Sequence, residues 1–306
     1  MERIPYLGHT IFKWQVGSSS FLALPEKGAR LMNWNVTLGD GSVRDIIYWP
    51  EIENLDNIAS VRGGNPILFP FNGRSYDQGE IHHWRADDGV RRPMPMHGLA
   101  RQGQFRITRL DEGGFSAQFV PDDAARAAYP YDYEFVVSYR FDPLALFVEL
   151  QLTNHGSQPI PWSAGHHFYF TLPWSPGRTR RDYVLETTAT KHLARGEKGE
   201  LLAGPRVNAR ETLDNKNLVD LIHTGLKRDV FAVTETGTGN RLFFRTSMAG
   251  SPARELAVVT WTADENSPFY CIEPWMGPPN APETKVGLHS VAPGQTQKFY
   301  VEVSLG

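Results

Sequence analysis

The chain has 306 residues, of which 41% are hydrophobic and 21% charged, and its 31 basic and 34 acidic side chains leave a formal net charge of −3. This balance does not indicate the basic surface with which proteins bind nucleic acid or anionic membranes. The single cysteine, Cys271, excludes an internal disulfide. The first residues lack the apolar core of a signal peptide, and no apolar run is long enough to span a bilayer, so we expect a cytoplasmic protein.

Alternation of apolar and polar residues, the pattern of half-buried strands, recurs along the chain. It appears first at 12–16 and again at 299–305. It is clearest at 133–153, where Asp142-Pro143 interrupts two alternating runs. A turn between two such runs predicts an antiparallel hairpin.

Helical patterns are few and short. The candidates are "PEIENLDNIASV" at 50–61 and "PDDAARAAYP" at 121–130, each opened by proline. Many short strands, together with 28 glycines and 22 prolines, favour an all-β fold, a sandwich or barrel with long loops. No repeat or linker divides the chain, so we expect a single domain over residues 1–306.

Glycine and proline gather in four stretches, which we expect to be loops apart from the strand that carries the histidine pair. Binding sites commonly lie on such segments of a rigid β scaffold. The stretches are "RGGNPILFPFNGR" (62–74), "RRPMPMHGLAR" (91–101), the segment around "AGHHFYF" and "CIEPWMGPPNAP" (271–282).

The two adjacent histidines of "SAGHHFYFTL" are expected to have different roles. Successive side chains of an extended backbone point to opposite faces, so His166 shares its face with Trp162 and Phe168 and is predicted to be a hydrogen-bonded core residue. His167 lies on the other face, which is small and polar. Gly165 is expected to leave space beside it for a ligand.

Motifs for metal, nucleophile or cofactor chemistry are absent. Neither His82-His83 nor His166-His167 has the spacing of a metal site, so we expect no metal. There is no G-x-S-x-G elbow, and Cys271 lies in an apolar run that predicts a buried, inert thiol. The glycine pattern at 62–66 leads into an apolar run and not into a helix, so no nucleotide cofactor is expected.

Glu273 is the unusual residue, because apolar, aromatic, glycine and proline residues surround it in "PFYCIEPWMGPP". Burial raises the pKa of a carboxyl and can make it a base near neutral pH, although a structural glutamate paired with arginine fits this residue equally well. Taken alone, His97 and Arg74 are a loop histidine and a solvated arginine. Together with eight tryptophans, these groups favour a site for a sugar.

Four motifs carry a family resemblance. "FNGR", "MHGLAR", "HHFYF" and "CIEPWMGPPN" resemble, in order and spacing, those of the aldose 1-epimerase (galactose mutarotase-like) family, over about residues 62–282. The resemblance implies a large antiparallel β-sandwich of the galactose mutarotase type, no metal or organic cofactor, and interconversion of the α and β anomers of an aldose. By motif, Glu273 resembles the family's general base and His167 its acid, while Arg74 and His97 resemble residues that contact sugar hydroxyls.

The chain departs from the family pattern at two places. His166 stands where the family has asparagine, and the family's substrate-binding aspartate is expected near 225–231, where only Asp229 is found. These departures leave the identity of the sugar open.

Three alternatives therefore remain beside an aldose 1-epimerase. A hexose-6-phosphate mutarotase would use arginines such as Arg62, Arg74 and Arg101 on the phosphate. A carbohydrate-binding sandwich without activity would need no buried base, and a glycoside hydrolase would need a second carboxylate or another base. We expect a small-molecule sugar as the partner, no nucleic acid or membrane, and a monomer or weak homodimer.

Overall fold

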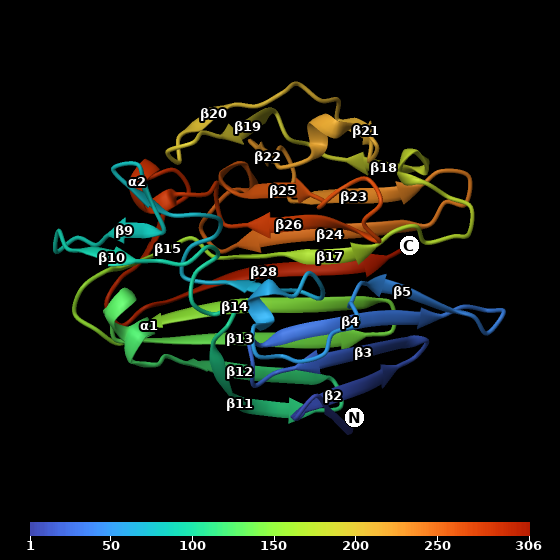
Figure 1. Cartoon of the computed structure of the whole chain (residues 1–306), viewed down its shortest axis with the longest axis horizontal. Coiled ribbons are helices and arrows are strands. Elements are labelled where there is room, and N and C mark those ends of the chain that lie inside the picture. The colour runs from blue at the N-terminus through green and yellow to red at the C-terminus, as the bar shows by residue number, and fades with distance from the viewer.

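Two large antiparallel sheets, of thirteen and nine strands, form the computed structural model, which describes residues 1–306 (Figure 1). The all-β sandwich predicted from the alternating pattern is confirmed. The first sheet runs in the order β1 (Glu2–Tyr6), β2 (His9–Val16), β3 (Ser19–Leu24), β4 (Arg30–Thr37), β5 (Val43–Ile47), β17 (Phe168–Thr171), β26 (Phe269–Trp275), β25 (Ala257–Trp261), β22 (Leu221–Thr224), β19 (Lys191–Arg195) and β20 (Leu201–Ala203), and β16 (Gly165–His166) joins β26 to β6 (Ile67–Leu68).

The second sheet is continuous. Its order is β11 (Gln104–Asp111), β12 (Gly114–Val120), β13 (Tyr133–Asp142), β14 (Ala145–Asn154), β28 (Thr296–Leu305), β24 (Arg241–Met248), β23 (Val230–Glu235), β18 (Tyr183–Glu186) and β21 (Arg210–Thr212). Three two-stranded ribbons complete the strands: β7 (Tyr76–Asp77) with β8 (Glu80–Ile81), β9 (His83–Arg85) with β10 (Arg91–Pro93), and β15 (Ile160–Trp162) with β27 (His289–Val291).

The predicted hairpin is β13–β14. Its ten residue pairs run from Tyr133 opposite Asn154 to Asp142 opposite Ala145. The apolar positions Phe135, Val137 and Tyr139 are fully buried, while their neighbours are partly exposed. The alternation in the sequence therefore places one face of the hairpin in the core.

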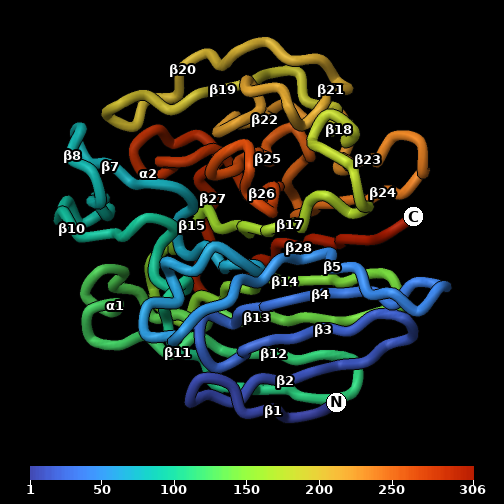
Figure 2. The backbone as a smooth tube through the Cα atoms, turned by 45° about the vertical axis from the view of Figure 1, so that its right-hand side comes forward, coloured from blue at the N-terminus to red at the C-terminus, as the bar shows by residue number.

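The core lies between the two sheets. In both views the strands β2–β5 lie over β11–β14 (Figures 1 and 2), and 58 buried residues form one cluster that draws on both sheets. Phe21 of the first sheet stacks on Phe141 of the second with ring centroids 4.3 Å apart. Phe170 meets Phe244 edge-on at 4.9 Å. Such aromatic pairs each add about 0.5–1.5 kcal/mol beyond the area they bury.

One predicted helix is confirmed and the other is wrong. The segment 121–130 contains α1 (Asp123–Ala128), which Asp122 begins by accepting a hydrogen bond from the Ala125 N–H at 2.7 Å. The segment 50–61 forms only a 3₁₀ turn, Ile58–Ser60. Three residues of this segment are buried, Leu55, Ile58 and Val61, and they pack as part of a loop on the outer side of the first sheet.

Tertiary packing overrides the helical pattern in this segment, because Leu55, Ile58 and Val61 are buried against the sheet without an α-helical turn between them. Asn54 Oδ1 accepts a hydrogen bond from the Asp56 N–H at 3.1 Å within the loop. The second α-helix, α2 (Ala281–Thr284), has four residues. No helix of the structure has the length and hydrophobicity needed to cross a membrane.

Candidate active site

Glu273 lies on β26, a central strand of the first sheet. The segment 271–282 was predicted as a loop, but its first residues continue this strand, between β17 and β25. Alternation on β26 puts Tyr270 and Ile272 in the core between the sheets and turns Cys271 and Glu273 to the other side. Glu273 is only 2% exposed, and the ladders on both sides fix its position.

The adjacent histidines face opposite sides, as predicted. His166 is fully buried and its ring stacks between Phe168 and Phe299 in the core. His167 turns to the side of Glu273, and its ring stacks on Tyr169 with centroids 4.7 Å apart. His167 Nε2 lies 3.4 Å from Glu273 Oε1, so a buried imidazole and a buried carboxyl are in direct contact.

Gly165 does not leave open space for a ligand, so that expectation is wrong. A Cβ at this position would lie 2.6 Å from Cδ1 of Trp275, because the indole packs directly on the glycine. The Trp275 indole N–H donates to the backbone carbonyl of His166 at 3.2 Å. The glycine therefore allows β16 and β26 to approach and helps to position the two histidines.

Asn65 is a positioning residue that the sequence did not reveal. Its Oδ1 accepts from the backbone N–H of His167 at 3.1 Å, and its Nδ2 contacts His166 Nδ1 at 3.0 Å and donates to the Tyr139 hydroxyl at 2.7 Å. Because a backbone N–H only donates, the amide orientation is fixed, and His166 Nδ1 must accept. His166 then carries its proton on Nε2, and burial lowers its pKa to about 3, so it is neutral.

His97 joins two of the predicted loops. Its backbone N–H donates to the Gly73 carbonyl at 2.7 Å, and the Gly73 N–H donates to His97 Nδ1 at 3.2 Å. The residue that follows must be glycine, because Gly98 has a φ of 78° and a Cβ there would lie 2.1 Å from the Phe69 carbonyl oxygen. The His97 ring meets the His167 ring edge-on at 5.3 Å. Burial lowers the pKa of His97 well below its ordinary value, and the charge of Arg74, which follows Gly73 directly, adds to the effect.

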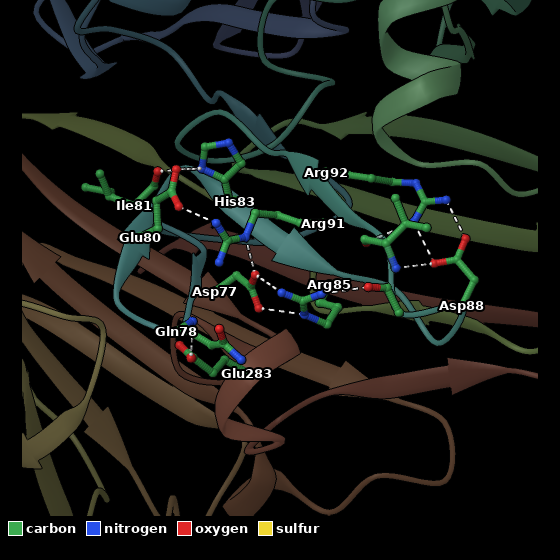
Figure 3. A network of polar contacts seen from close by, with 12 residues as sticks. Asp77, Gln78, Glu80, Ile81, His83, Arg85, Asp88, Arg91, Arg92 and Glu283 are labelled. Carbon is green, nitrogen blue, oxygen red and sulfur yellow. Dashed lines mark hydrogen bonds and ion pairs between the residues drawn. The ribbon is translucent and has the colours of Figure 1, made fainter.

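The segment after Arg74 is held by a network of charged side chains (Figure 3). Asp77 of β7 accepts bonds from Arg85 at 3.0 and 2.7 Å and is also paired with Arg91, which in turn pairs with Glu80. The Gln78 N–H donates to Glu283 of α2 at 2.8 Å. These contacts fix the β7–β10 ribbons against the segment that follows Glu273 on β26.

Burial controls the protonation of the central pair. It raises the pKa of Glu273 well above its ordinary value; Arg195 and Arg101 oppose this effect, and Asp220 adds to it. Burial also lowers the pKa of His167 well below its ordinary value, and the Arg101 charge acts in the same direction. Both shifts favour a neutral pair, with the proton on the carboxyl, whereas the motif comparison implied a carboxylate and an imidazolium.

The structure does not bring Asp229 into this cluster. Asp229 precedes β23 of the second sheet, where its backbone carbonyl accepts from the Thr246 N–H at 2.9 Å. The carboxylate whose charge reaches Glu273 is that of Asp220, immediately before β22, which is ion-paired with Arg195. Nothing in the local sequence "NLVDLIHT" distinguishes Asp220, since only the pairing of β22 with β25 brings it near β26.

Cys271 is buried beside the pair, as an inert thiol was expected to be. One ligand atom from each of Cys271, His167 and Glu273 lies within 4.8 Å of the others, close enough for a single ion, and zinc accepts this donor set. Burial raises the pKa of the Cys271 thiol well above its ordinary value, which favours a protonated thiol over a metal-binding thiolate. The absence of a metal from the reaction stays a prediction.

Comparison with known proteins identifies the family. The family model for aldose 1-epimerase matches residues 13–304. The chain belongs to the aldose 1-epimerase family. Among curated proteins it is 23% identical to the plasmid-encoded LacX of Lactococcus lactis, over 79% of this chain and 85% of LacX.

Solved structures show the same fold. A galactose mutarotase-like protein from Clostridium acetobutylicum superimposes with a TM-score of 0.80 at 18% identity, covering 100% of this chain and 98% of that one. A galactose mutarotase related enzyme from Lactobacillus acidophilus gives 0.78 at 18% identity, with 97% of each chain covered. The predicted sandwich of the galactose mutarotase type is therefore confirmed.

Proposed function

We propose that this member of the aldose 1-epimerase family is a mutarotase that interconverts the α and β anomers of an aldose without a cofactor. The observation that carries the proposal is the contact between two buried titratable groups, Glu273 on β26 and His167 between β16 and β17, both of which pair with β26. The alternative of a structural glutamate needs an arginine partner, and the only basic group within 4.0 Å of the Glu273 carboxyl is His167.

Anomerisation requires one base and one acid that exchange roles. In ring opening, Glu273 takes the proton from the C1 hydroxyl while His167 gives a proton to the ring oxygen, which breaks the bond between C1 and that oxygen. Rotation about C1–C2 presents the other face of the aldehyde. In closure the C5 hydroxyl attacks C1, His167 recovers its proton and the Glu273 carboxyl protonates the new C1 hydroxyl, so no atom is lost or gained.

The electrostatics of the pair suit this cycle. Burial favours the neutral pair, which is the state from which the ring closes. The charges of Arg195 and Arg101 lower the pKa of Glu273 and so favour the carboxylate that opens the ring. His97, only 7% exposed and edge-on to His167, and Arg74 are proposed to contact the sugar hydroxyls.

Polarimetry of freshly dissolved α-D-glucose and α-D-galactose tests the activity. We expect the protein to accelerate the approach to the anomeric equilibrium above the spontaneous rate. A sandwich that only binds sugar would leave that rate unchanged. A glycoside hydrolase would release reducing ends from an oligosaccharide, but the second carboxylate it requires would be Asp220, which is ion-paired with Arg195.

A hexose-6-phosphate mutarotase is the second candidate. It is favoured by Arg101 and Arg74, whose charges reach His97 and which have no carboxylate partner within ion-pair distance. Arginine without an acidic partner suits a phosphate oxygen. The ratio of anomerisation rates on glucose 6-phosphate and glucose distinguishes the two candidates.

A further inference from the structure

A cavity of about 1070 Å³ lies at the far edge of the first sheet, between β19–β20 and the segment that follows α2. Four basic side chains line it, those of Lys191, Lys227, Arg254 and Lys285, against one carboxylate, that of Glu255. We name it the cationic cavity. None of the four forms an ion pair with any carboxylate of the protein.

This concentration of unpaired positive charge is unusual for the molecule. The chain as a whole carries a net charge of −3, and ten of its arginines, all outside this cavity, are ion-paired with a carboxylate. Leu201, Leu226 and Leu288 add an apolar lining, which suits the carbon face of a sugar ring. The combination fits a ligand that carries both a ring and an anionic group.

Strand register connects the cationic cavity to Glu273. Glu273 pairs with Val259, Val259 with Ile222, and Ile222 with Leu193, which itself lines the cavity. Directly paired residues of antiparallel strands point to the same side of the sheet. Leu193 therefore points to the side of the sheet that carries Glu273, three strand spacings or about 14 Å away, so the cavity reaches that side at β19, while Leu226, Ala253 and Leu288 of its lining pack against the core between the sheets.

The distance selects the kind of ligand. Lys191 lies two residues before Leu193 and on the same side of β19, and a lysine side chain reaches about 6 Å from its Cα. Three strand spacings and two residues along the strand put the Lys191 Cα about 15 Å from that of Glu273, so the extended lysine would meet an anionic group about 10 Å from the Glu273 backbone. In a hexose 6-phosphate bound at Glu273 the phosphate is only about 5–6 Å from C1, whereas a phosphate on the second ring of a disaccharide lies at about 10 Å.

Resting on the proposed mutarotase activity, we propose that the cationic cavity binds the distal phosphate of a phosphorylated disaccharide whose reducing-end sugar occupies the site of Glu273. Lysine and arginine both bind phosphate oxygens through charge-assisted hydrogen bonds, and a doubly charged phosphate accepts bonds from several of them at once. The substrate class is then a reducing disaccharide with a phosphate on its non-reducing ring.

The experiment compares kcat/KM for anomerisation of maltose, maltose 6′-phosphate and glucose by polarimetry. We expect maltose 6′-phosphate to exceed maltose about tenfold or more. In the double variant Lys191→Glu/Lys227→Glu this advantage should be lost while the glucose rate is unchanged. The control Lys13→Glu/Lys216→Glu makes the same change in net charge outside the cavity and should keep the advantage. If the wild-type protein gave the same kcat/KM for maltose and maltose 6′-phosphate, the proposal would be overturned.

Calorimetric binding separates this proposal from the proposed function. If the protein does not anomerise glucose but binds maltose 6′-phosphate more tightly than maltose, and the Lys191→Glu/Lys227→Glu variant loses that difference, the mutarotase proposal fails and the phosphate site stands. If inorganic phosphate binds as tightly as maltose 6′-phosphate, the cavity is a free-anion site and the disaccharide proposal is overturned. All four substituted lysines are exposed or half-buried, so thermal melts should show unchanged folding.

Discussion

Replacing Glu273 with glutamine removes the proposed base with little change in side-chain size. Without a carboxylate to accept the C1 proton, turnover should fall by about 10²–10⁴-fold, the usual contribution of a positioned acid or base. This corresponds to about 3–5 kcal/mol of activation free energy. The affinity for the sugar should change little, since glutamine keeps the shape and part of the hydrogen bonding.

The same change has a predicted effect on stability. Burial raises the pKa of Glu273 in the folded protein above its unfolded value, so the folded state binds this proton more tightly. The stabilisation is fully present below the unfolded pKa and is lost as the pH rises through the folded pKa. Since glutamine does not titrate, the melting temperature of Glu273→Gln relative to wild type should be higher at pH 8 than at pH 4.

The assay is polarimetry on a fresh α-anomer, run beside thermal melts at both pH values. Glu265→Gln is the matched control, because Glu265 is an exposed glutamate in the turn before β26 and should change neither quantity. If Glu273 instead holds the fold together, the variant should melt lower at pH 8 and turn over at nearly the normal rate. Near-normal turnover would falsify the base assignment.

Three further predictions concern the histidines and metal. His167→Asn should reduce turnover by about 10²-fold or more at unchanged melting temperature. His166→Ala should lower the free energy of unfolding by about 1–3 kcal/mol in urea titrations, while the folded protein keeps most of its turnover. A stable but inactive His166→Ala variant would reverse the two roles. The rate should depend on pH as a bell-shaped curve whose two limbs belong to the coupled pair of Glu273 and His167. Because burial lowers the pKa of His167, the acid limb should lie below the ordinary histidine pKa of about 6.5. An acid limb above that value would contradict this assignment. Dialysis against EDTA should leave turnover unchanged, and restoration of a lost activity by zinc would show that Cys271 belongs to a metal centre.

The sequence by itself determined the features that depend on neighbouring residues. Alternation with a period of two predicted the β13–β14 hairpin and placed His166 and His167 on opposite faces, because adjacent side chains of a strand diverge wherever the strand lies. The apolar residues on either side of Glu273 in the sequence predicted its burial, because such a run is removed from water as a unit. The order of four short motifs was sufficient to indicate the family.

Only the tertiary structure decided which distant residues meet. Asn65 orders the histidine pair from about a hundred residues away, and Trp275 fills the space beside Gly165. Asp220, not Asp229, reaches Glu273, because the register of β22 and β25 sets the one position and the second sheet holds the other. Such contacts follow from how all the strands pair and pack together, and no local pattern in the chain specifies that arrangement.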